Sequence, residues 1–182
     1  MPSYIAMLRG INVGANKRMK MEKLRSSCES LGFEDVKTYI QSGNIVFRAG
    51  KLSDAALSKK LGDCIARVFG FSADVITRTT DEMERIVESN PLVKEKGLDE
   101  SKFHVIFLSE KPSPASLKKL QELILPPDRV RSSDREIYFY FPNGVSGSSL
   151  WKHSLDKVLT ITATMRNWNT VNKLYEMARD LG

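Results

Sequence analysis

Cysteine, histidine and long apolar segments are all scarce in this sequence of 182 residues. The two cysteines and two histidines form no cluster with the spacing of metal ligands, so no metal site is expected. No apolar run approaches the roughly 18–20 residues that cross a bilayer, so no membrane partner is expected. The first residues lack the charged start and long apolar core of a signal peptide, which favours a cytoplasmic protein.

Familiar catalytic and nucleotide-binding patterns are also missing. The sequence contains neither a G-x-S-x-G nucleophile elbow nor the GxxxxGK[ST] spacing of a P-loop. Whether the protein is an enzyme therefore stays open, and neither a catalytic residue nor a cofactor is predicted. Cys28 and Cys64 each fall on the apolar face of an expected helix, which predicts two buried thiols rather than a disulfide.

Positive charge is unevenly distributed along the chain. The net charge is +6, and the first 80 residues carry 13 basic and 7 acidic side chains. The basic residues concentrate around one acidic residue, Glu22, in a cluster formed by Arg9, Lys17, Arg18, Lys20, Lys23 and Arg25. Such a cluster favours an anionic ligand or partner, whereas a solvated surface face is the alternative interpretation, above all for Lys23 and Arg25.

Hydrophobic periodicity and turn residues predict an alternation of strands and helices. The expected strands are 4–9, 36–40, 45–48, 73–79, 103–108, 130–132, 136–141 and 161–165. The expected helices are 21–31, 52–69, one that Thr80 or Asp81 caps and Pro91 ends, 113–124, 150–159 and 168–181.

This order predicts an α+β protein of two ferredoxin-like βαββαβ halves, with antiparallel sheets covered by helices. The first half is expected over residues 1–80 and a connecting helix and linker over 81–101. The second half, with a C-terminal helix, is expected over 102–182. The two halves share the order of their elements and no evident residue identity.

The topology predicts where distant polar segments of the first half meet. In a βαββαβ sheet the loop after the first strand and the turn between the second and third strands lie at the same end. Here these segments are GINVGANKR and QSGN. Glycine serves turns, and amide and basic side chains can hold an anion beside a helix start. The candidate ligand-binding residues are Arg9, Asn12, Lys17, Lys20, Gln41, Ser42 and Asn44.

A second cradle is predicted in the second half, where PNGVSGSS and TMRNWN follow two strands that end on the same side. Its candidate ligand-binding residues are Lys152, Arg166 and Asn167. The alternative for Asn167 is a cap of the last helix.

Three segments, LRGINVGANK, YIQSGNIVF and TMRNWNTVNKL, together resemble the domain-of-unknown-function 1697 family of mostly bacterial proteins. The resemblance implies a fold of two ferredoxin-like parts and supplies no activity. The residues that match the family's motifs are Arg9, Gly10, Asn12, Gln41, Ser42, Gly43, Asn44, Arg166, Asn167 and Trp168. The family's glycine pair after the first strand stands here as Gly14-Ala15.

Three hypotheses for function follow. The first is a module or enzyme that binds a small phosphate- or carboxylate-bearing ligand at the basic sheet end. The second is a nucleic-acid-binding protein that uses the basic N-terminal half, although the strands lack the RNP1 pattern and the aromatic residues Tyr39, Phe47 and Phe103 are isolated. The third is an interaction protein without catalysis, in which the polar motifs hold the two halves together. The sequence does not determine an oligomeric state.

Overall fold

The computed structural model describes all 182 residues. The first half runs through β1 (Ser3–Leu8), α1 (Met21–Glu29), β2 (Glu34–Tyr39), β3 (Asn44–Arg48), α2 (Asp54–Phe69) and β4 (Val75–Thr79). Helix α3 (Thr80–Glu88) and short 3₁₀ turns at Pro91–Lys94 and Glu100–Lys102 follow. The second half runs through β5 (Phe103–Leu108), α4 (Pro114–Leu123), β6 (Arg129–Ser133), β7 (Glu136–Tyr140), α5 (Leu155–Leu159), β8 (Ala163–Asn167) and α6 (Trp168–Arg179).

Each half forms a four-stranded antiparallel sheet with the strand order of a ferredoxin-like fold. In the first sheet β3 lies between β2 and β1, and β4 pairs with the other side of β1. The second sheet repeats this order as β6-β7-β5-β8. The predicted α+β architecture of two βαββαβ halves is therefore confirmed.

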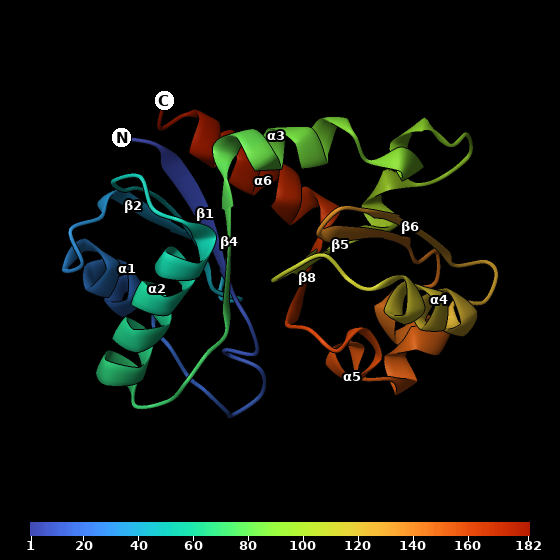
Figure 1. The fold of residues 1–182 in the computed structure, drawn as a ribbon, viewed down its shortest axis with the longest axis horizontal. Helices are drawn as coiled ribbons and strands as arrows, with labels where there is room; N and C mark the ends of the chain where they lie inside the picture. Colours follow the sequence, from blue (N-terminus) through green and yellow to red (C-terminus); the bar gives the residue numbers. More distant parts are fainter. The chain divides into compact units, whose positions relative to one another are not determined.

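The core of the first half lies between its sheet and the helices α1 and α2. All six residues of β1 are buried, and Tyr4, Ala6 and Leu8, which share one face of the strand, belong to this core. Helices α1 and α2 pack against each other and cover this face (Figure 1). Cys28 and Cys64 are both free and buried, which confirms the predicted pair of buried thiols.

Local sequence signals begin and end the longer helices. The Ser53 hydroxyl accepts a hydrogen bond from the backbone N–H of Ala56 at the start of α2, and Gly70 ends that helix in the left-handed conformation. Ser113 caps α4 in the same way, with Pro114 at the first helical position. These capping residues fix the ends of α2 and α4, and the observed ends lie within two residues of the predicted ones.

The prediction of one helix over 150–159 is wrong, because this segment divides into two pieces. A 3₁₀ turn covers Ser149–Lys152, and α5 begins only after Ser154. The Ser148 hydroxyl accepts from the N–H of Leu150, and the N–H of His153 donates to the Leu150 carbonyl, which closes the tight turn. Apolar periodicity alone does not distinguish such a turn from a continuous helix.

The fourth strand of each half runs directly into a helix, β4 into α3 and β8 into α6 (Figure 1). Thr79, rather than Thr80 or Asp81, caps α3, since its side chain and that of Glu82 each accept the other residue's backbone N–H. A buried arginine immediately precedes each cap: Arg78 is 1% exposed and Arg166 is 8% exposed. The two halves therefore share a buried arginine directly before a helix cap, although their sequences show no evident residue identity.

The chain divides into two compact units. The first unit is Met1–Arg85 together with Lys173–Gly182, and the second is Ile86–Asn172. The segment 81–101, expected as a connecting helix and linker, holds α3 from its second residue, the 3₁₀ turn Pro91–Lys94 and the first two residues of the turn Glu100–Lys102. None of the helices has both the length and the apolar character needed to cross a membrane.

Candidate functional site

Strand register brings three segments together at one end of the first sheet. Met7 pairs with Asn44 across β1 and β3, and Leu8 pairs with Val75 across β1 and β4. The N–H of Leu8 donates to the Gly43 carbonyl at 2.8 Å. The loop after β1, the turn between β2 and β3, and the start of β4 therefore lie side by side.

Asn12 fastens the loop after β1 to this turn. Its side-chain oxygen accepts the N–H of Met19 at 2.7 Å, and its Nδ2 donates to the carbonyls of Met19 at 3.0 Å and Gln41 at 2.8 Å. Its backbone is left-handed, with φ of 53°, a conformation that asparagine tolerates better than most residues. The Asn12 amide thus holds the loop in place just before α1 begins.

Asn44 and Gly43 build the turn between β2 and β3. Asn44 is fully buried and donates to the Tyr39 carbonyl at 2.9 Å and to the Ser42 hydroxyl at 3.0 Å. Gly43 has φ of +82°, and a Cβ added there would stand 2.5 Å from Cδ1 of Ile11. Asn44 and Ser42 are therefore engaged within the turn and do not line the pocket described below.

Arg9 and Lys17 are engaged with the segment that leads into β4. The Arg9 guanidinium lies 3.8 Å from the Asp74 carboxylate, and Lys17 donates to the Ser72 carbonyl at 2.8 Å. Both side chains lie at the predicted end of the sheet. Their contacts direct them toward the α2–β4 connection and not into the pocket.

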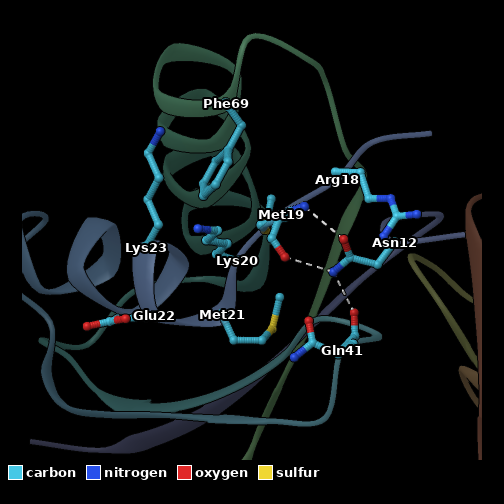
Figure 2. A pocket seen from close by; sticks show the side chains of 9 residues that line it. All are labelled: Asn12, Arg18, Met19, Lys20, Met21, Glu22, Lys23, Gln41 and Phe69. Carbon is cyan, nitrogen blue, oxygen red and sulfur yellow. Dashed lines mark hydrogen bonds between the residues drawn. The ribbon is translucent and has the colours of Figure 1, made fainter. Parts of the chain in front are cut away.

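A pocket of about 790 Å³ opens beside the start of α1 (Figure 2). Three predicted ligand-binding residues, Asn12, Lys20 and Gln41, line it. The other lining residues are Arg18, Met19, Met21, Glu22, Lys23 and Phe69. Its volume lies within the range of about 300–1,000 Å³ that is typical of small-molecule sites.

The cations in this pocket differ in how they are engaged. Arg18 and Lys20 are exposed, and neither side chain forms a hydrogen bond or an ion pair. Lys23 donates weakly to the Val68 carbonyl at 3.4 Å, and its ammonium lies 5.1 Å from the centre of the Phe69 ring. Arg18 and Lys20 are therefore the two cations available to a ligand without breaking an existing contact.

Negative charge in the pocket is limited to Glu22. In Figure 2 its carboxylate points away from Arg18 and Gln41. Helix α1 begins after Lys20, whose side chain makes no capping hydrogen bond. The partial positive charge of this helix start adds to that of the three cations. The pocket therefore has a positive character.

The second half places its candidate residues differently. Asn167 accepts the N–H of Thr170 at 2.8 Å and so caps α6, the alternative considered for it. Arg166 donates to the Thr164 hydroxyl at 2.8 Å and the Met165 carbonyl at 2.9 Å, and burial lowers its pKa to about 10. Lys152 is exposed at the end of a 3₁₀ turn. Of these three residues, none lines the pocket beside α1.

Other chemistry is sparse in the structure. No three His, Cys, Asp or Glu side chains come close enough to hold a metal ion. Desolvation lowers the pKa of His104, whose ring lies 5.4 Å from that of Phe141. Two of the three aromatic residues considered for nucleic-acid stacking, Phe47 and Phe103, are buried in the interior and have no exposed ring face.

Three cationic or aromatic residues of the pocket escaped the set of candidates from sequence. Arg18 and Lys23 both belong to the basic cluster of the sequence, where a solvated surface position is the alternative for Lys23. Phe69 carried no signal, because an aromatic residue at the end of a helix is usually part of a core. Only the packing of α2 beside α1 brings its ring to the pocket.

The architecture defines the chain as an α+β protein of two ferredoxin-like halves. Residues 1–138 match the family model described as "Protein of unknown function (DUF1697)", and the chain belongs to this family, which confirms the resemblance. A solved structure titled "The structure of conserved bacterial protein SP0830 from Streptococcus pneumoniae" is similar in fold. It is 24% identical in sequence, the match covers 97% of this chain and 98% of that chain, and the TM-score is 0.78. No curated protein matches the sequence.

Proposed function

We propose that the first half of the protein binds a small ligand carrying phosphate or carboxylate groups in the pocket beside the start of α1. The observation that carries this proposal is the gathering of Arg18, Lys20 and Lys23 around one pocket that contains a single carboxylate. Arg18 offers a planar fork that can make two parallel hydrogen bonds to either group, and the lysines add compact charge.

The surrounding residues support this arrangement. Asn12 uses its amide to hold the backbone of Met19 and Gln41, so that the residues on both sides of the pocket are fixed relative to each other. A ligand that meets a fixed site loses less binding energy to ordering of the protein. Asn12 is therefore proposed to position the site, while Arg18 and Lys20 contact the ligand.

The proposal is tested by titrating the protein with inorganic phosphate, pyrophosphate and citrate, followed by calorimetry and thermal unfolding. A ligand at a hundred times its Kd stabilises the folded state by about 2.7 kcal/mol. In a protein of this size such a gain raises the Tm by about 5–10 °C. The R18Q/K20Q variant should lose this response.

The matched control is K118Q/K119Q, which removes the same charge from two exposed lysines of α4. It should respond to the anions as the unmodified protein does. Equal loss in both variants would mean that overall charge, not the pocket, attracts the anion. No response in the unmodified protein would remove the proposal.

We also propose a cytoplasmic location for the protein. It is supported by the two cysteines, which are both buried and both unpaired. Fractionation of the cells that produce the protein, with detection by antibody, would test this location, and recovery from an oxidising compartment would contradict it.

A further inference from the structure

We infer that the ligand of this pocket is a nucleoside phosphate whose base stacks on the Phe69 ring, an inference that rests on the proposed function. Phe69 is the last residue of α2, and its half-buried ring forms part of the pocket wall. A bare phosphate or carboxylate gains nothing from an aromatic surface. A base gains stacking energy from such a surface and brings a phosphate to the cations in the same pocket.

Lys23 links the aromatic and the cationic parts of the pocket. Its ammonium lies over the Phe69 ring, and Figure 2 shows the two side chains next to each other at one end of the labelled group. Because Lys23 is exposed and has a flexible four-carbon stem, it can leave the ring when a base stacks there. Its ammonium then lies within reach of the phosphate that accompanies the base.

Gln41 adds a group suited to a base or a sugar. Its side-chain amide forms no hydrogen bond in the structure and is exposed at the pocket. A primary amide offers both a donor and an acceptor, which matches the polar edge of a nucleobase or a ribose hydroxyl. The pocket therefore combines an aromatic wall, a free amide and free cations, the three features that a nucleoside phosphate requires.

The experiment compares ribose 5-phosphate with nucleoside 5′-monophosphates by calorimetry on the full chain. The nucleotides should bind more tightly, and the F69L variant should lose about fivefold to a hundredfold of this advantage. The matched control is F71L, since Phe71 is also half-buried, lies 6.1 Å from Phe69 ring to ring, and does not line the pocket. F69Y keeps the ring and should keep the preference, which separates stacking from damage to the fold.

The possible outcomes of this comparison can be told apart. If ribose 5-phosphate and the nucleotides bind equally, and F69L changes neither, the inference is overturned while the proposed anion site stands. If no phosphate compound binds, both fail. A short oligothymidylate is added as a competitor to distinguish free nucleotides from single-stranded nucleic acid as the source of the ligand. Displacement of the nucleotide from the Phe69 site by the oligomer would identify single strands as one source. Oligomer binding that is unaffected by F69L would contradict the inference.

Discussion

Asn12 is the residue on which the local structure of the candidate site depends. Replacement by alanine removes the acceptor for the N–H of Met19 and two donors to backbone carbonyls. We expect N12A to lower the free energy of unfolding by about 1–3 kcal/mol, because partly buried polar groups lose their partners. Urea unfolding measures this loss.

N16A is the control, since Asn16 lies exposed in the same loop and its side chain makes no hydrogen bond. It should change stability by less than about 0.5 kcal/mol. If N12A were as stable as N16A, the three hydrogen bonds would not hold the loop.

Gly43 and Gly10 both have positive φ, yet only Gly43 is confined by neighbours. A Cβ at Gly43 would meet Ile11 and Leu8, whereas a Cβ at Gly10 meets nothing within 4 Å. We expect G10A to cost about 1 kcal/mol for the left-handed backbone alone, and G43A to cost about 2–4 kcal/mol in total. Denaturant titrations of the two variants measure the difference, and equal costs would contradict the confinement of Gly43.

The buried Cys28 thiol makes the free energy of unfolding depend on pH in the alkaline range. Burial raises its pKa from 9.0 to about 12, with the nearby Cys64 as a second cause. The unfolded chain therefore releases this proton first, and the free energy of unfolding should fall as pH rises from about 9 toward 12. The slope should be smaller in C28A, and at pH 8 a disulfide reagent should label neither native thiol. Rapid labelling of the native protein would show that the thiols are accessible.

At the scale of elements, the capping of α6 gives Asn167 a structural role that can be separated from ligand binding. N167A should cost about 0.5–2 kcal/mol of unfolding free energy, and N167D should restore most of it, because a carboxylate oxygen also accepts the N–H of Thr170. N169A, at an exposed position in the first turn of the same helix, should have little effect. Chemical unfolding measures the stability of the three variants, and equal stabilities would contradict the cap.

Element order and type followed from the sequence because they depend on apolar spacing and on strong local signals. Ser53, Gly70 and Ser113 mark helix ends through their own hydrogen bonds or φ angles. The division of residues 149–159 and the cap at Thr79 did not follow, since both depend on which of several adjacent polar groups meets a backbone N–H. Tertiary packing determines which polar group within a single turn accepts the backbone N–H.

The candidate site followed from the sequence only in part. The topology correctly gathered the loop after β1 and the turn after β2 at one sheet end. Whether a cation there faces a pocket is decided by its neighbours: Asp74 engages Arg9 and the Ser72 carbonyl engages Lys17, while Arg18 and Lys20 remain available. Those neighbours lie more than 50 residues further along the chain, beyond the reach of local patterns.

At the scale of the whole molecule, the net charge of +6 predicts a second, weaker kind of anion binding. The protein should be retained on heparin at low ionic strength and released by about 0.2 M salt, since exposed charges are screened beyond about 8–10 Å. R18Q/K20Q should elute only slightly earlier while losing its response to phosphate in solution. Loss of both together would mean that the pocket and the general surface charge act as one.

The three hydrogen bonds of the Asn12 side chain all end on main-chain atoms, of Met19 and Gln41. The hydrogen bonds that fix the pocket therefore do not depend on which side chains stand at positions 18, 20 and 41. A change of residue at these positions alters what the cavity recognises and leaves its supports intact. Evolution, or an engineer, can therefore exchange one specificity for another on this scaffold without having to rebuild it.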